Sequence, residues 1–127
     1  MASVDVGDAV FVHESVVRGH NIYKETWTPR VGEILLVRQE PGNEHDRKAV
    51  CLLKGEMIVG HVPREFSRFF WFFLSHGGRI SCEVTGRRKH GKGLEVPCAF
   101  RFFGPERMVP KMKDILLARS KTTPCSQ

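Results

Sequence analysis

The segment AVCLLKGEMIVGHVP, from Ala49 to Pro63, sets the architecture expected of this chain. Its two apolar runs, Ala49 to Leu53 and Met57 to Val62, flank the polar tripeptide Lys54-Gly55-Glu56, a pattern typical of a β-hairpin. A strong turn signal, Pro41-Gly42-Asn43, lies just upstream. The middle of the chain is therefore expected to be a pair of antiparallel strands.

Strand-like segments continue on both sides of this hairpin. Residues rich in β-branched and aromatic side chains cover Ala9 to Val17 and Glu33 to Arg38, and later Arg79 to Gly86 and Leu94 to Phe103. A polar connection from Arg87 to Gly93 joins the last two, and its glycines let it bend. The sequence predicts a mainly β protein, a small barrel of OB or SH3-like type with about six strands.

The periodicity changes after Pro63. Helical spacing relates five apolar residues before the Gly77-Gly78 stop, namely Phe66, Phe69, Phe70, Phe73 and Leu74. Trp71 and Phe72 flank this stripe, and burial in the core is favoured over exposure to a partner. A short helix is expected after Pro105, marked by Met108, Met112, Ile115 and Leu116.

A length of 127 residues suits one domain. We expect an N-terminal extension over 1–9, the barrel domain over 10–118 and a flexible tail over 119–127, since periodicity is lost from about Ser120. No apolar run reaches the roughly 18 residues of a membrane span, so no membrane partner is expected. Nothing indicates an oligomer, and a monomer is expected.

The four cysteines form no CxxC pair, and the histidines show no metal-ligand spacing. We expect free thiols, with Cys51, Cys82 and Cys98 buried in strands, and a reducing compartment, nucleus or cytoplasm with the nucleus favoured. Phosphate-binding and nucleophile motifs are missing too. The sequence therefore predicts a binding module with no cofactor and no metal, not an enzyme.

Twenty Lys and Arg against fourteen Asp and Glu give a net charge of +6, which favours nucleic acid as a partner. The densest positive run is RRKHGK, from Arg87 to Lys92. Its candidate contacts to a nucleic-acid backbone are Arg87, Arg88, Lys89 and Lys92. A solvated loop that only keeps the protein soluble is the alternative.

Two segments together carry a resemblance to a known family. PGNEHDRKAV, Pro41 to Val50, followed by VGHVPR, Val59 to Arg64, is similar to the signature of the HIRAN domain. The segment Val16 to Tyr23 resembles that family's first strand, and Leu94 to Gly104 resembles its last. The resemblance covers roughly residues 10 to 117. It implies a modified OB-type barrel that binds nucleic acid. From the family's end-binding members it also implies capture of the 3′ end of single-stranded DNA, in a repair or replication setting.

The resemblance also implies roles for particular residues. Tyr23 matches an aromatic of the first strand, Asn43 and Asp46 match the turn that meets the terminal nucleotide, and His61 with Arg64 matches a phosphate-binding corner. A stacking aromatic of the last strand would be one of Phe100, Phe102 and Phe103. From the residues alone, Asp46 is equally a turn residue bonded to nearby backbone, and His61 a structural histidine.

Two departures from the family weaken this expectation. Ile22 and His45 stand where end-binding members have tyrosines, and an isoleucine offers no π-face to a base. His45 can still stack and, once protonated, meet phosphate. The chain has no room for a helicase motor, so it would be a stand-alone module or a fragment. The alternative is a protein-interaction module on the same barrel, with Trp27, Trp71 or Phe72 as exposed anchors.

Overall fold

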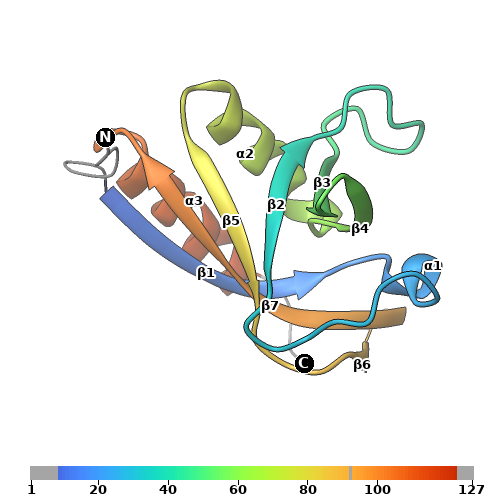
Figure 1. Ribbon diagram of the computed structural model, residues 1–127. Coiled ribbons are helices and arrows are strands. Elements are labelled where there is room, and N and C mark those ends of the chain that lie inside the picture. Colours follow the sequence, from blue (N-terminus) through green and yellow to red (C-terminus); the bar gives the residue numbers. More distant parts are fainter. Residues whose placement is uncertain (1–8, 92, 123–127) are drawn as a thin grey trace.

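The computed structural model describes residues 9–91 and 93–122 (Figure 1). Six strands hydrogen-bond antiparallel in the order β1-β7-β5-β2-β3-β4, and β6 pairs with β7 beside this path. The strands are β1 (Ala9–Val17), β2 (Ile34–Gln39), β3 (Val50–Lys54), β4 (Met57–His61), β5 (Arg79–Val84), β6 (Lys89–Gly91) and β7 (Gly93–Gly104). The predicted strands are all present, and the mainly β fold expected from the sequence is confirmed.

The sheet curls until its two outer strands meet. Just after β1, Arg18 pairs with His61 at the end of β4, with N to O distances of 2.8 Å and 2.9 Å. Within the described residues, β1 and β4 do not pair as strands, and this single bridge joins the two ends of the sheet. The barrel is therefore closed at one point and remains partly open. Gly60 allows the approach, because a Cβ atom there would lie 2.3 Å from Cγ1 of Val17.

Helix α2 (Arg64–Ser75) covers the barrel with its apolar stripe, as its spacing predicts. Phe70 and Phe73 are fully buried, but Phe72 keeps 46% of its surface exposed. The expected burial of Phe72 is therefore wrong, since the sheet covers only one side of the helix. Trp71 is partly buried.

Helix α3 (Val109–Thr122) follows Pro105 and packs its residues Val109, Met112 and Leu116 into the core. It continues past residue 118, so the expected tail over 119–127 begins inside a helix, and 123–127 lie outside the described residues. In the part of the chain that the structure describes, no helix combines the length and apolar character needed to cross a membrane.

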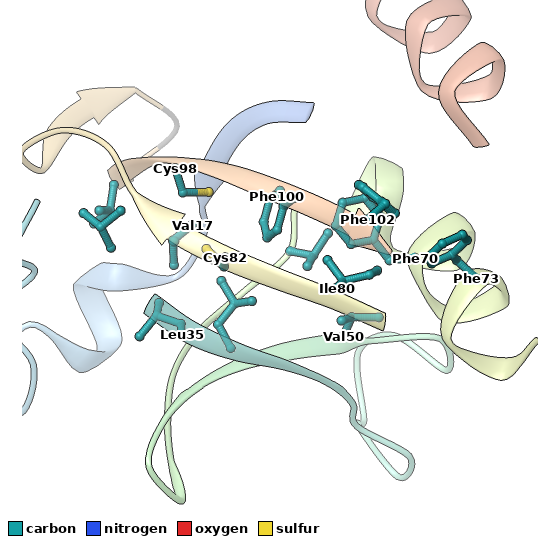
Figure 2. Packing of buried hydrophobic residues seen from close by; sticks show 14 of the residues in the cluster. Val17, Leu35, Val50, Phe70, Phe73, Ile80, Cys82, Cys98, Phe100 and Phe102 are labelled. Atoms are coloured by element: carbon teal, nitrogen blue, oxygen red, sulfur yellow. The ribbon is translucent and has the colours of Figure 1, made fainter. Parts of the chain in front are cut away.

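Aromatic rings fill the core between α2 and the sheet, and the thiols of Cys82 and Cys98 lie farther along the same strands, near Val17 (Figure 2). Phe70 meets Phe100 and Phe102 edge-on, with ring centroids 4.9 Å and 5.0 Å apart. The prediction for the strand cysteines is confirmed, since Cys51, Cys82 and Cys98 are free and buried, whereas Cys125 lies outside the described residues. These buried rings pack α2 closely against the sheet.

Trp27 is not the exposed anchor that the protein-interaction alternative needs. Its side chain is 2% exposed, and its indole N–H donates to the Glu33 carboxylate at 3.1 Å. A buried tryptophan of this kind supports the loop before β2 and presents no surface to a partner.

Two short elements were not expected from the sequence. Helix α1 (His20–Tyr23) follows Gly19, whose φ of 83° turns the chain out of β1. Tyr23 therefore ends a helical turn and is not part of a strand, which corrects the expectation drawn from the family's first strand. The connection between β5 and β7 contains strand β6, which pairs antiparallel with the start of β7 and forms a hairpin with it.

Candidate functional site

A pocket of about 280 Å³ opens where β1 meets β4. It brings together all five residues that the sequence singles out in the turn and the corner, and it adds residues from the β1–α1 junction. The lining residues are Arg18, Gly19, Ile22, Asn43, His45, Asp46, Ala49, Val50, His61, Val62 and Arg64. Segments separated by more than forty residues in the chain therefore form one concave site.

The turn between β2 and β3 is organised by its own side chains. The side-chain amide oxygen of Asn43, Oδ1, accepts the backbone N–H of His45 at 2.8 Å and that of Asp46 at 2.9 Å. One Asp46 oxygen accepts the N–H of Lys48 at 2.9 Å. The turn role that the residues allow for Asp46 is thus observed, and it fixes where the carboxylate points.

Asp46 also links this turn to helix α2. Its second oxygen accepts the hydroxyl of Ser67 at 2.7 Å, and Ser67 is buried. A carboxylate offers about four lone-pair positions. Asp46 therefore retains capacity to accept a further hydrogen bond from a molecule in the pocket.

His61 and Asn43 share a carboxylate beneath the pocket. The same Glu40 oxygen lies 2.6 Å from Nε2 of His61 and accepts the Asn43 amide at 3.1 Å. Sequence analysis missed Glu40, although an acidic residue directly before the Pro41 turn was a usable signal. A carboxylate in this position orients the His61 imidazole and holds the Asn43 amide.

Tyr23 lies beside this cluster but not on the pocket wall. Its ring centroid is 6.5 Å from that of His61. Burial and, after it, the Glu40 carboxylate raise the pKa of the Tyr23 phenol, so the hydroxyl keeps its proton at neutral pH.

Two arginines line the pocket, and they differ in their partners. Arg64 begins α2, is exposed, and its side chain makes no ion pair within the described residues. No side chain among the described residues caps the start of that helix, so its first N–H groups add to the attraction for an anion. Arg18, which sequence analysis missed, pairs with Glu95 at 2.9 Å and Glu65 at 3.5 Å. The sequence did offer a usable signal for Arg18, because it is a basic residue directly before the glycine that follows the first strand.

The basic hairpin β6–β7 lies next to α1 (Figure 1). Arg88 donates to Nε2 of the buried His20 at 3.1 Å. Burial, followed by the charges of Arg88 and Lys24, lowers the pKa of His20, which keeps the ring neutral and able to accept. Arg87 and Lys89 are exposed, and Lys92 lies outside the described residues. Ile22, on the same helix as His20, is 74% exposed at the pocket rim.

Phe102 has no part in this site. It is 0% exposed and packs against Phe11, Phe70 and Phe73, and Phe100 is equally buried. The expectation of a stacking platform at Phe102 is wrong, because its strand position faces the barrel interior. Among the described residues, no group of three or more His, Cys, Asp or Glu could hold a metal ion.

Solved HIRAN domains share this fold. The crystal structure of the HIRAN domain of human HLTF is 20% identical, with 89% of this chain and 93% of that chain covered and a TM-score of 0.71. The NMR structure of the HLTF HIRAN domain in its DNA-bound conformation is 19% identical, covers 91% and 93%, and has a TM-score of 0.68. A crystal structure of a protein from Lactobacillus plantarum is 22% identical, covers 75% and 98%, and has a TM-score of 0.55.

No family model matches the chain, and no curated protein matches it either. The structural likeness shows that the chain has the HIRAN fold, which confirms at the level of the fold the resemblance carried by Pro41 to Arg64.

Proposed function

We propose that this protein binds nucleic acid, with single-stranded DNA favoured, and that the pocket at the β1–β4 joint receives the 3′ end of the strand. The observation that carries the proposal is one cavity that combines the acceptor Asp46, the unpaired cation Arg64 and an uncapped helix N-terminus. Support also comes from the shared fold, because the HLTF HIRAN domain has been solved in a DNA-bound conformation.

The three groups match the chemistry of a strand end. A terminal 3′-hydroxyl needs an acceptor, which Asp46 supplies, and the adjacent phosphate needs donors, which Arg64, His61 and the α2 N–H groups supply. Ala49, Val50 and Val62 give the pocket an apolar floor for the sugar. At about 280 Å³ the pocket lies at the small end of ligand sites, which suits one nucleotide and not a duplex.

The rest of the strand is proposed to leave past Ile22 toward the β6–β7 hairpin. Arg88 is held against α1 through His20, and Arg87 and Lys89 project beside it. These charges would track the backbone of any sequence, so this part of the binding depends on salt. The proposal includes a monomer acting in a nuclear, repair-associated setting.

End recognition is tested by fluorescence anisotropy with two single strands of the same sequence, one ending in a 3′-hydroxyl and one in a 3′-phosphate. The natural chain is expected to prefer the hydroxyl, and Asp46→Ala is expected to abolish that preference. Titrations at several salt concentrations should show affinity falling steeply with salt.

Asp46→Ala also removes the bond to Ser67, so the matched control is Ser67→Ala. That variant loses the same hydrogen bond and keeps the carboxylate, and it should retain the preference for a free 3′-hydroxyl. Equal binding of both strands by the natural chain would exclude end capture. Binding that does not respond to salt would contradict the nucleic-acid function as a whole.

A further inference from the structure

Helices α2 and α3 contact each other and leave a groove between them, whose lining residues differ from those of the pocket described above. Two adjoining hollows of about 330 and 520 Å³ make up this groove and share Phe72, His76, Lys111 and Ile115. Phe69 and Trp71 extend it on one side, and Met108 and Met112 on the other. Neither hollow shares a lining residue with the pocket, so the groove is a separate site.

The charge around this α2–α3 groove has one sign. Its lining holds four cationic side chains and no Asp or Glu, the cations being Lys48, Arg68, Arg107 and Lys111. In the part of the chain that the structure describes, neither Arg107 nor Lys111 forms an ion pair. An apolar groove rimmed only by cations is complementary to an acidic, apolar partner.

The aromatic faces in the groove are already engaged within the chain. Lys48 lies 5.1 Å from the centre of the Trp71 ring, and Arg68 lies 4.9 Å from that of Phe69. The Phe72 ring lies 4.1 Å from His76, tilted by 34°. Bases of a single strand bind by stacking on free aromatic faces. The groove is also lined by two methionines and Ile115, which suit apolar side chains.

We propose that the α2–α3 groove docks an acidic amphipathic segment of a partner protein. A bulky apolar side chain of that segment enters beside Phe72 and Ile115, and its carboxylates pair with Lys111, Arg107 and Lys48. Helices that lay an apolar face into a groove of this kind are a recurring mode of peptide recognition. Because the groove and the pocket share no residue, partner and nucleic acid can bind together.

The test starts from a displayed library of random peptides of about 12 residues, enough for roughly three helical turns. Peptides are selected on the full chain and then depleted on a variant carrying Phe72→Ser with Lys111→Glu. The expected survivors carry Asp or Glu around Phe, Leu, Met or Trp. A selected peptide should bind the natural chain about tenfold more tightly than it binds Phe72→Ser alone.

The matched control is Lys113→Glu, which makes the same charge change as Lys111→Glu on the same helix. Lys113 is exposed and does not line the groove, so it should leave peptide binding unchanged. Phe72 and Lys111 lie at the surface, and thermal unfolding of each variant verifies that the fold is retained.

Three results would overturn the proposal. One is a selection in which no peptide depends on Phe72 and Lys111, and another is a set of dependent peptides without acidic residues. The third is loss of single-stranded DNA binding in Phe72→Ser, which would make the groove part of the nucleic-acid path. None of these outcomes bears on end recognition at Asp46, which its own variant tests.

Discussion

At the pocket, single side chains both order the turn and line the cavity. Asp46 accepts hydrogen bonds from Lys48 and Ser67 and still lines the cavity, and Asn43 holds two backbone N–H groups while it also lines the cavity. These bonds order the turn before anything binds. A binding site ordered in advance loses less conformational entropy on binding, so the geometry favours affinity.

Ile22 is the residue at which this pocket departs most clearly from the HIRAN signature that the sequence resembles. It is 74% exposed on the rim, and His45 is exposed across the same pocket. Replacing both by tyrosine should tighten binding of a strand with a free 3′ end by about 1 to 3 kcal/mol for each base that gains a stacking surface. Anisotropy titrations of the single and double variants measure the gain.

A control for this gain is Val31→Tyr, which adds the same ring at a residue that is 65% exposed and outside the pocket. It should leave affinity unchanged. Equal tightening by Val31→Tyr would mean that any added aromatic surface suffices, and no tightening by the double variant would mean that bases do not reach the rim.

Among the elements, the β6–β7 hairpin has the clearest link between position and charge. Strand β6 pairs with β7 from Lys89 opposite Glu95 to Gly91 opposite Gly93, and the Arg88 side chain donates to His20 of α1. A run that looks like a loop in the sequence is thereby held beside the pocket rim. The hairpin is consequently suited to guide a strand toward the pocket.

Replacing Arg87, Arg88 and Lys89 together by alanine should weaken binding to single strands of any sequence. It should also reduce the slope of log affinity against log salt concentration, by the equivalent of up to about three phosphate contacts. The preference for a free 3′-hydroxyl should remain, because Asp46 is untouched. The measurement is affinity against salt concentration for two unrelated sequences.

A variant with the same loss of charge elsewhere separates local contact from net charge. Three exposed cations that line neither the pocket nor the groove are Arg30, Lys54 and Lys113. Replacing these three by alanine should change the salt dependence of the affinity little. If both triple variants behaved alike, the hairpin would contribute only to overall charge.

For the whole molecule, the decisive feature is the single bridge that joins β1 to β4. Arg18 and His61 make this bridge with their backbones and line the pocket with their side chains. Closing the barrel therefore also assembles the site. Anything that separates these strands should reduce stability and binding together.

Gly60→Ala is expected to separate them, because the new Cβ would lie 2.3 Å from Cγ1 of Val17. Overpacking of this kind costs about 1 to 3 kcal/mol, and binding to a 3′-hydroxyl strand should fall as well. Urea unfolding gives the change in the free energy of unfolding, and anisotropy gives the change in affinity.

Adding Val17→Ala makes room for the new methyl group. The double variant should be more stable than the sum of the two single changes predicts, by about 0.5 to 3 kcal/mol. Strict additivity would show that Gly60 is not constrained by Val17 and that the contact between β1 and β4 has another basis.

Local pattern was sufficient to predict most elements of this protein. The strands and α2 follow from alternation, helical spacing and turn residues, all of which act over a few neighbouring positions. The turn at Asn43 to Asp46 followed in the same way, since its side chains bond to their own backbone. The short elements α1 and β6 were not predicted, because one helical turn and a three-residue strand are too short to show a repeating pattern of apolar residues.

Only the tertiary structure decided which of the candidate site residues lie close together. Phe102 alternates into the barrel and Phe72 points away from it, although both are apolar residues in apolar runs. Arg18, Glu40 and Arg64 come together at one site because the curled sheet brings the end of β1 to the end of β4. Sequence periodicity determines which face of an element is apolar, whereas the closure of the sheet determines which ends become neighbours and where the charges gather.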